Sequence, residues 1–117
     1  MIKSNELRQG NYVQHNTGQK EVKVESVGKG AINNFPENEF EPVFLTESIL
    51  SNAGFVRGVD STSLPSGPYR KGLCEIKVGN EYYDAVFSQP NGTRLPHVHQ
   101  LQNLYFALTG EELDVKL

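Results

Sequence analysis

The chain has no tryptophan and only one cysteine, Cys74, among its 117 residues. A single thiol cannot form an internal disulfide, and it cannot supply a metal site that needs several cysteines. No apolar run is long enough to cross a bilayer, and residues 1–20 lack the basic and then apolar design of a secretory signal. These absences predict a cytoplasmic protein that does not bind a membrane.

Positive charge is also scarce, with 11 Lys and Arg residues against 14 Asp and Glu residues and a net charge of -3. A general nucleic-acid binder needs a concentrated basic face, so we exclude that class and keep only a small local anion site. The length, with 37% apolar and 21% charged residues, is typical of a globular protein with one core. We therefore expect residues 1–117 to form a single domain.

Alternating apolar residues predict a β-hairpin near the start of the chain. The segments "GNYVQH" and "KEVKVESV" flank a turn at residues 16–19, and Val22 and Val24 share one face because they are two residues apart. This hairpin resembles the opening hairpin of a small SH3-like barrel. Residues 28–44 are rich in Asn, Glu and Pro, and they predict a long connection with one short edge strand near residues 39–44.

The segment "LCEIKVGNEYYDAVF" predicts a second hairpin that turns at Gly79-Asn80, a dipeptide suited to a two-residue turn. In this register Glu75 and Asp84 lie opposite each other on the outer side. Residues 59–72, just before the hairpin, predict a polar loop. The predicted core face carries Cys74, Ile76, Val78, Tyr83, Ala85 and Phe87, and burial there favours a structural role for the cysteine.

Two helices are predicted from the signals at their ends. Thr46 is a good N-cap and Gly54 a good C-terminal glycine, and together they bound a short helix near residues 46–54. Pro96 suits the first turn of a longer helix near residues 96–109. The closing "EELDVKL" alternates apolar residues and predicts a C-terminal strand. Two hairpins, two helices and this strand predict the α+β fold class.

His97 and His99 raise the question of a metal site. Successive residues of a helix rotate by about 100°, so side chains two positions apart diverge. The two imidazoles can meet only if the helix begins late, near Gln100, and the histidines are extended. No second cluster of spaced His, Asp or Glu completes a site. We therefore expect no metal, no cofactor and no catalytic residue.

Two interpretations of this histidine pair stay open. In the first, His97 is a partly buried residue at the helix start, bonded to backbone, and His99 lies on the surface. In the second, the free N–H groups of the helix start act together with Arg94 and one or both histidines. Such a site would bind a phosphate or a carboxylate.

The segment "GPYRKG" places the chain's only adjacent basic pair, Arg70 and Lys71, beside Tyr69. It suits a nucleotide, with phosphates on the cations and the base on the tyrosine ring. A solvated loop ahead of a strand is the plainer interpretation. The candidates for ligand binding are therefore Tyr69, Arg70, Lys71, Arg94, His97 and His99.

Phe106 lies opposite the apolar stripe of the longer predicted helix, on the same side as His99. Either the terminal strand or the long loop covers this phenyl ring, or the ring belongs to an interface. In the second case Phe106, Gln102 and Asn103 would contact a partner or another copy of the chain.

Three blocks of sequence resemble one family: "NELRQGNYV", "PVFLTESILSNAGF" and, most specifically, "HVHQLQNLYFALTGEEL". They are similar to small uncharacterised proteins encoded by phages and prophages of Bacteroidota. The blocks cover about a third of the chain and come in the expected order, whereas the loops between them do not match. The resemblance implies a setting, an accessory gene of a phage or mobile element, and it carries over no catalytic residue.

Within that setting the sequence favours a non-enzymatic binding protein. It would act by protein–protein interaction on a host or phage factor, for example against host defence, and it would form a homo-oligomer. The alternative is a small-ligand binder that sequesters an anionic ligand such as a nucleotide immune signal. The sequence supports least a metal-dependent enzyme that uses the segment "HVH".

Overall fold

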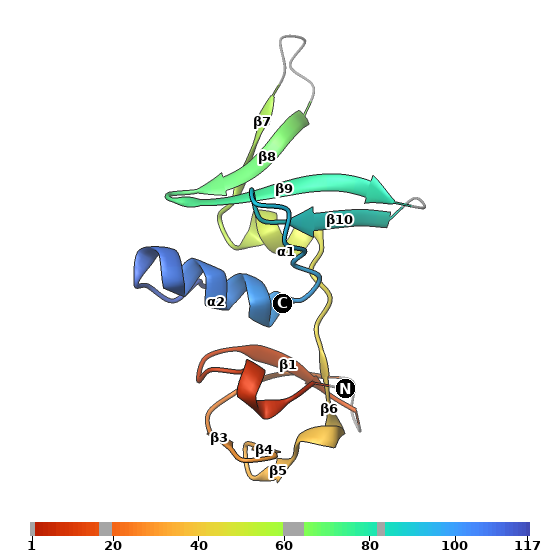
Figure 1. Cartoon of the computed structure of the whole chain (residues 1–117), viewed down its shortest axis with the longest axis vertical. Helices are drawn as coiled ribbons and strands as arrows, with labels where there is room; N and C mark the ends of the chain where they lie inside the picture. The colour runs from red at the N-terminus through yellow and green to blue at the C-terminus, as the bar shows by residue number, and fades with distance from the viewer. Residues whose placement is uncertain (1, 17–19, 60–64, 82–83) are drawn as a thin grey trace. The chain divides into compact units, whose positions relative to one another are not determined.

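The computed structural model describes residues 2–16, 20–59, 65–81 and 84–117, and it has the predicted α+β fold class (Figure 1). Two α-helices accompany ten strands in three antiparallel sheets over these ranges. The chain divides into two compact units, which are described in turn. Unit 1 comprises Met1–Phe44 and His97–Asn103, and unit 2 comprises Leu45–Pro96 and Leu104–Leu117. The single domain expected from the sequence stays a prediction.

Unit 1 is built on a three-stranded sheet with the order β2-β1-β6. Its strands are β1 (Tyr12–His15), β2 (Lys20–Lys23) and β6 (Phe40–Pro42). The first hairpin and the short edge strand near residues 39–44 are thereby confirmed. The described strands do not close into an SH3-like barrel, because the next strands of the chain are two residues long and pair only with each other.

A second small sheet of unit 1 comes from the segment that we predicted as a mostly irregular connection. It contains β3 (Val27–Gly28), β4 (Ala31–Ile32) and β5 (Phe35–Pro36), and two 3₁₀ turns flank it, η1 (Ser4–Glu6) and η2 (Glu37–Glu39). Asn33 and Asn34 form the β4–β5 turn with φ of 50° and 67°, a conformation that asparagine tolerates. The buried core of unit 1 comprises Ile2, Val13, Val24, Ile32 and Phe40.

Unit 2 is built on a four-stranded sheet with the order β10-β9-β8-β7. The strands are β7 (Val56–Val59), β8 (Pro65–Lys71), β9 (Cys74–Glu81) and β10 (Asp84–Ser88). The prediction of a polar loop over residues 59–72 is therefore wrong, because most of this segment is strand. Polar residues are compatible with strand structure here because the sheet has one exposed face.

The hairpin of β9 and β10 forms in a different register from the predicted one. Val78 pairs with Phe87 rather than Glu81, and the strands therefore continue past Gly79-Asn80, pairing as far as Glu81 and Asp84. The displacement is an even number of residues, so the odd–even assignment of faces still holds, and Cys74, Ile76 and Phe87 are buried. Ala85, also predicted on the core face, is exposed, and Tyr83 lies outside the described residues. The predicted pair of Glu75 with Asp84 is wrong, because Asp84 pairs with Glu81.

The short helix α1 (Glu47–Asn52) has both of the predicted ends. The Thr46 hydroxyl accepts a hydrogen bond from the backbone N–H of Ile49 at 3.2 Å. At the other end Gly54 adopts φ of 96°, and the N–H of Phe55 donates to the carbonyl of Leu50 at 3.1 Å. This pattern is a Schellman motif, and it turns Phe55 back into the core, where it is 3% exposed.

The longer helix α2 (Val98–Thr109) begins two residues after Pro96, later than predicted. Its buried side carries Val98, His99, Leu101, Gln102 and Tyr105, whereas Leu108 is 44% exposed. The polar Gln102 is buried because its side chain hydrogen-bonds the backbone of Gly10 and Tyr12 in unit 1.

The chain ends without the predicted C-terminal strand. Residues 112–117 are irregular, although Leu113 and Val115 are buried as their alternation suggests. Two apolar side chains can bury themselves in this way without any ladder of backbone hydrogen bonds. Within the described ranges, no helix is long and apolar enough to cross a membrane.

Candidate functional site

The two histidines of the helix start lie side by side in unit 1. Their rings stack with centroids 5.6 Å apart and planes 14° from parallel. The predicted divergence is wrong because His97 precedes the helix and forms an isolated β-bridge with Phe44, so only His99 has a helical position. The backbone N–H of His97 donates to Gln100 Oε1 at 3.1 Å, which satisfies one donor of the helix start.

His99 is buried, with 2% of its surface exposed, and not on the surface as the first interpretation had it. Burial, and then the neighbouring His97, lower the pKa of His99 to about 4. Its Nδ1 is buried and has no hydrogen-bond partner among the described residues, and its Nε2 lies 3.9 Å from Glu6 Oε2. His97 is half-buried, as predicted, and burial lowers its pKa as well. Both rings are therefore neutral at pH 7.

The described part of the chain offers the histidine pair no third ligand for a metal. Among the residues that the structure describes, no group of three or more His, Cys, Asp or Glu side chains is placed to hold an ion. Cys74 is buried, and desolvation raises the pKa of its thiol to about 11. A thiol with such a pKa is protonated at pH 7, which fits the predicted structural role.

The side chains of the "GPYRKG" segment are largely engaged within unit 2. Tyr69 is only 7% exposed, and its hydroxyl donates to Glu47 Oε1 at 3.1 Å. Burial and this carboxylate raise the pKa of Tyr69. Lys71 donates from Nζ to the carbonyl of Ala53 at 2.6 Å, and its ammonium lies 5.5 Å from the ring centroid of Tyr105. A base cannot stack on a ring that is this deeply buried.

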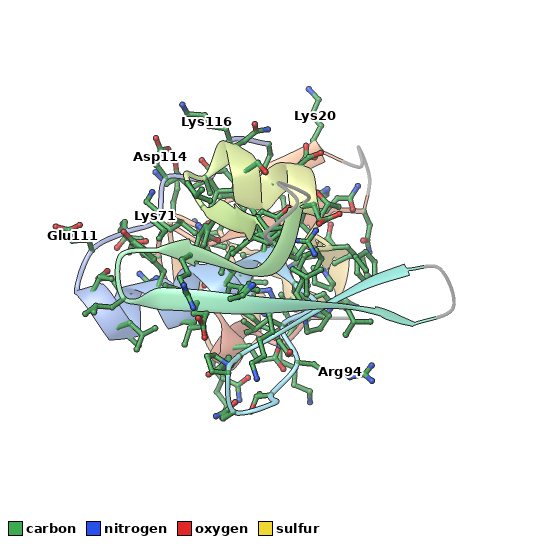
Figure 2. The ribbon with its side chains drawn as sticks, turned by 90° about the horizontal axis from the view of Figure 1, so that it is seen from above. Lys20, Lys71, Arg94, Glu111, Asp114 and Lys116 are labelled. Carbon is green, nitrogen blue, oxygen red and sulfur yellow. The ribbon has the colours of Figure 1, made fainter. Side chains whose placement is uncertain are left out.

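Arg70 and Arg94 differ from these two residues because both are exposed. Arg70 forms an ion pair with Glu75, with Nη2 and Oε1 2.7 Å apart. Arg94 pairs through its backbone with Ser88, and Figure 2 shows its side chain extending away from the ribbon. The predicted ligand residues are divided between the units, with Tyr69, Arg70, Lys71 and Arg94 in unit 2 and both histidines in unit 1.

Gln102 and Asn103, predicted at an interface, bind the chain's own first strand region instead. The Gln102 side chain accepts from the N–H of Tyr12 at 2.8 Å and donates to the carbonyl of Gly10 at 3.0 Å. Asn103 accepts from Asn11 Nδ2 at 2.9 Å. Gln102 is 1% exposed and thus inaccessible to a partner, so its interface prediction is wrong. The Gln102 amide therefore hydrogen-bonds the backbone of residues 10–12 as a neighbouring strand would.

Phe106 has the surface exposure that an interface residue needs. It is 39% exposed and lies in unit 2 with Leu108, at 44%, on the last turns of α2. Three further apolar side chains of this unit are more exposed, Val56 at 72%, Leu73 at 78% and Leu117 at 48%. The predicted cover by a terminal strand is absent, and sequence periodicity alone had not identified Val56 or Leu73.

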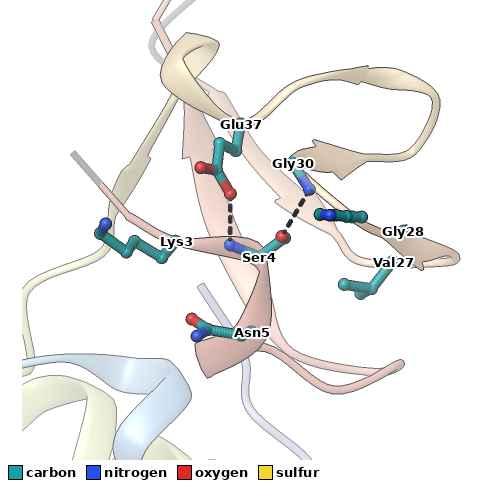
Figure 3. A pocket seen from close by; sticks show the side chains of 8 residues that line it. Lys3, Ser4, Asn5, Val27, Gly28, Gly30 and Glu37 are labelled. Carbon is teal, nitrogen blue, oxygen red and sulfur yellow. Dashed lines mark hydrogen bonds between the residues drawn. The ribbon is translucent and has the colours of Figure 1, made fainter.

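Unit 1 contains a polar pocket of about 550 Å³ that the sequence did not predict. It is lined by Lys3, Ser4, Asn5, Val27, Gly28, Lys29, Gly30 and Glu37. Figure 3 shows Ser4 at its centre, where the Ser4 N–H donates to Glu37 Oε2 at 2.7 Å and its hydroxyl accepts from the N–H of Gly30 at 3.1 Å. The bond from Ser4 holds the pKa of Glu37 below its ordinary value. The sequence signal for this pocket is the segment "GKG" at residues 28–30.

A second pocket of unit 1, of about 330 Å³, is lined mostly by apolar surface. Its walls come from the first sheet and from the β4–β5 turn region: His15, Lys20, Val22, Asn33, Phe35 and Phe40. The imidazole of His15 meets both phenyl rings edge to face, with centroids 5.9 Å from Phe35 and 5.0 Å from Phe40. We call this site the aromatic pocket. Its residues come from four strands and one turn, so no local sequence motif predicts it.

Comparison with known proteins does not add a function to this geometry. No protein-family model, no curated protein and no solved structure matches the chain.

Proposed function

We propose that the protein is a non-enzymatic binding protein that acts through protein–protein interaction. The observation that carries this proposal is the exposure of large apolar side chains at one end of unit 2. Val56 and Leu73 are 72% and 78% exposed, and Phe106 and Leu108 add 39% and 44%. Exposed apolar side chains that gather in one region are typical of surfaces that bind another protein.

The contacts of Lys71 support the grouping of these side chains. Lys71 is two residues from Leu73, and its ammonium lies 5.5 Å from the ring of Tyr105, the neighbour of Phe106. Figure 1 and Figure 2 both draw the β8–β9 turn near the end of α2. Val56 pairs with Arg70, so it lies at the same end of the sheet, on the outer face that also carries Arg70. We call Val56, Leu73, Phe106 and Leu108 the apolar end of unit 2.

The polar residues beside the apolar end have the composition of an interface rim. Arg70 forms its ion pair with Glu75 at 2.7 Å on the outer face of the sheet, and the Arg70 side chain is 67% exposed. Interfaces characteristically place a few apolar anchors next to an arginine, with charged groups at the margin. Arg70, a ligand-binding candidate from the sequence, thus has a role at the margin of a protein contact.

The proposed partner is a host or phage factor, and this part of the proposal depends on the resemblance of the closing segment to phage and prophage proteins. An action against host defence and a homo-oligomeric state belong to the same proposal. The alternative ligand, a nucleotide, is less well supported, since the Tyr69 ring is 7% exposed and Lys71 is bonded to Ala53.

The experiment compares capture by the wild-type protein with capture by Leu73→Asp and by Phe106→Ser. Tagged proteins are expressed in a Bacteroidota host with and without phage, and co-purified proteins are quantified by mass spectrometry. We expect one partner in stoichiometric amount that falls at least about tenfold with each variant, because a central apolar anchor contributes about 1–2 kcal/mol or more. Reconstitution with the purified partner, or analytical ultracentrifugation if the partner is the chain itself, then gives the affinity.

The matched control is Phe44→Ser, which changes an aromatic residue that is 70% exposed in unit 1 and lies outside both the apolar end and the aromatic pocket. It should leave capture unchanged. Equal capture by the wild type and both apolar-end variants, with folding confirmed by circular dichroism, would refute the proposed function.

A further inference from the structure

We infer that the aromatic pocket of unit 1 binds a planar aromatic ring that carries a negatively charged group. This inference goes beyond the proposed function, since it concerns another unit and does not require a protein partner. The ring could belong to a free aromatic acid or to an aromatic side chain beside an acidic residue. The chemistry recognised is the same in both cases.

The strand register places three different side chains in one row across the first sheet. His15 pairs with Lys20 on one side and with Phe40 on the other, so the three side chains share a face. The row therefore runs from a cation through an imidazole to a phenyl ring. Val22, two residues from Lys20, lies on the same face and extends the apolar wall.

Phe35, which belongs to β5, forms the other side of the pocket. Its ring meets His15 edge to face at 5.9 Å but remains 52% exposed, whereas Phe40 is 1% exposed. The pocket thus has a buried aromatic wall and an open one. An aromatic ring that enters it can pack against the exposed ring of Phe35, and aromatic pairs attract each other beyond the area that they bury.

The open wall is held in place before a ligand arrives. Asn33, which also lines the pocket, accepts hydrogen bonds at Oδ1 from the N–H groups of Glu25 and Ser26 at 2.7 and 3.1 Å. Its Nδ2 donates to the carbonyl of Lys23 at 3.0 Å. These bonds fix the β4–β5 turn that leads into Phe35. A preformed wall reduces the entropy lost on binding.

Volume and charge restrict the ligand further. A volume of about 330 Å³ is at the lower limit for ligand pockets, so it suits one ring system and a short substituent. Lys20 is the one charged side chain that lines the pocket in the described part of the chain, and it is exposed at the rim. Glu39 is not part of the lining; it faces His15, with Oε1 and Nε2 3.6 Å apart. An aromatic cage for a cation would have a carboxylate where Lys20 stands.

The test is an NMR titration of the ¹⁵N-labelled full chain with phenylacetate, phenylacetamide and benzyltrimethylammonium. We expect saturable amide shifts in β1, β2 and β5 with phenylacetate, at a dissociation constant of about 1 mM. Phenylacetamide should bind about threefold or more weakly, because it lacks the charge that Lys20 attracts. Two short peptides, with tryptophan beside aspartate or beside lysine, distinguish the sources: tighter binding of the acidic peptide than of phenylacetate identifies a protein segment.

Two variants link the signal to the pocket. Lys20→Glu should weaken phenylacetate binding about fivefold or more, and Phe35→Ala should weaken all aromatic probes by a similar factor. Lys116→Glu is the matched charge control, because Lys116 is exposed in unit 2 (Figure 2). Leu117→Ala is the matched apolar control, since Leu117 is 48% exposed.

Three outcomes would overturn the inference. They are the absence of saturable shifts with phenylacetate, tighter binding of benzyltrimethylammonium than of phenylacetate, and phenylacetate binding that Lys20→Glu and Phe35→Ala leave unchanged. Since the capture experiment depends on Leu73 and Phe106 of unit 2, a failure here does not count against the proposed function.

Discussion

At the scale of single residues, the unusual group is the buried imidazole of His99. The Nδ1 atom has no hydrogen-bond partner among the described residues, and His99 as a whole is 2% exposed. Protonation would place a charge in an environment that solvates it poorly, which is why its pKa is lowered to about 4. The folded state therefore contains the neutral ring, and we expect acid to destabilise the folded state.

This residue predicts a pH dependence of stability with a defined sign. The pKa of His99 lies below that of an unfolded histidine, 6.5, so the unfolded chain binds more protons between about pH 6.5 and pH 4. The contribution of His99 to the free energy of unfolding is complete above pH 6.5 and is lost as the pH falls to 4. The loss approaches about 1.4 kcal/mol per pH unit in the middle of this window.

Urea unfolding at pH 7, 6 and 5 measures this effect in the wild type and in His99→Phe. The variant keeps a flat ring but cannot be protonated, so its stability should fall less steeply over the same range. His97 also has a lowered pKa and remains as a smaller source of slope in both proteins. Parallel pH profiles for the two proteins would show that His99 is not the titrating group.

At the scale of elements, the end of α1 shows how one glycine and one lysine act together. Gly54 adopts φ of 96°, and a Cβ at this position would lie 3.0 Å from Nζ of Lys71. The same ammonium donates to the carbonyl of Ala53 at 2.6 Å, at the negative end of the helix. A side chain at residue 54 would strain the backbone and displace this cation.

We predict that Gly54→Ala lowers the free energy of unfolding by about 1–2 kcal/mol, from the left-handed backbone and the displaced lysine. Chemical denaturation gives the value. The control is Gly28→Ala, since Gly28 has no such φ and a Cβ there meets nothing within 4 Å. The free energy of unfolding of the Gly28→Ala variant should differ from that of the wild type by less than about 0.5 kcal/mol. Equal effects of the two substitutions would contradict the proposed role of the Gly54 conformation.

Elements also show which sequence signals were sufficient. The Thr46 cap and the Gly54 turn were correctly predicted because each involves residues within a few positions of one another. The β9–β10 register was not correctly predicted, because the dipeptide "GN" fits a tight turn and also fits a continuing strand. Pairing of the sheet as a whole, not the dipeptide, selects between the two.

At the scale of the whole molecule, α2 belongs to both units. Residues up to Asn103 are part of unit 1, where Gln102 binds the backbone of Gly10 and Tyr12. Residues from Leu104 onward are part of unit 2, where Tyr105 meets Phe55 with ring centroids 6.3 Å apart. One continuous helix therefore supplies buried residues to both cores, and damage to its middle should affect both.

We predict that Leu104→Pro accelerates amide hydrogen exchange in β1 of unit 1 and in β9 of unit 2. Proline in a helix interior removes a hydrogen bond and costs about 3 kcal/mol. Leu104→Ala is the control, because it preserves the helix while it shortens the same half-buried side chain. Hydrogen exchange read by mass spectrometry reports both strands. Faster exchange in one unit alone would mean that the helix does not couple them.

The sequence by itself determined the α+β class, the two helices with their caps, and the alternation that buries Cys74, Ile76 and Phe87. Such features depend on residues within a few positions of one another. Only the tertiary structure decided that His99 and Gln102 lie inside while Leu108 and Phe106 lie outside. Apolar periodicity had placed His99 and Gln102 opposite the apolar stripe of α2, but Gln102 finds its partners about ninety residues away, and no local pattern records them. The aromatic pocket depends in the same way on register between strands, which is set by the whole sheet.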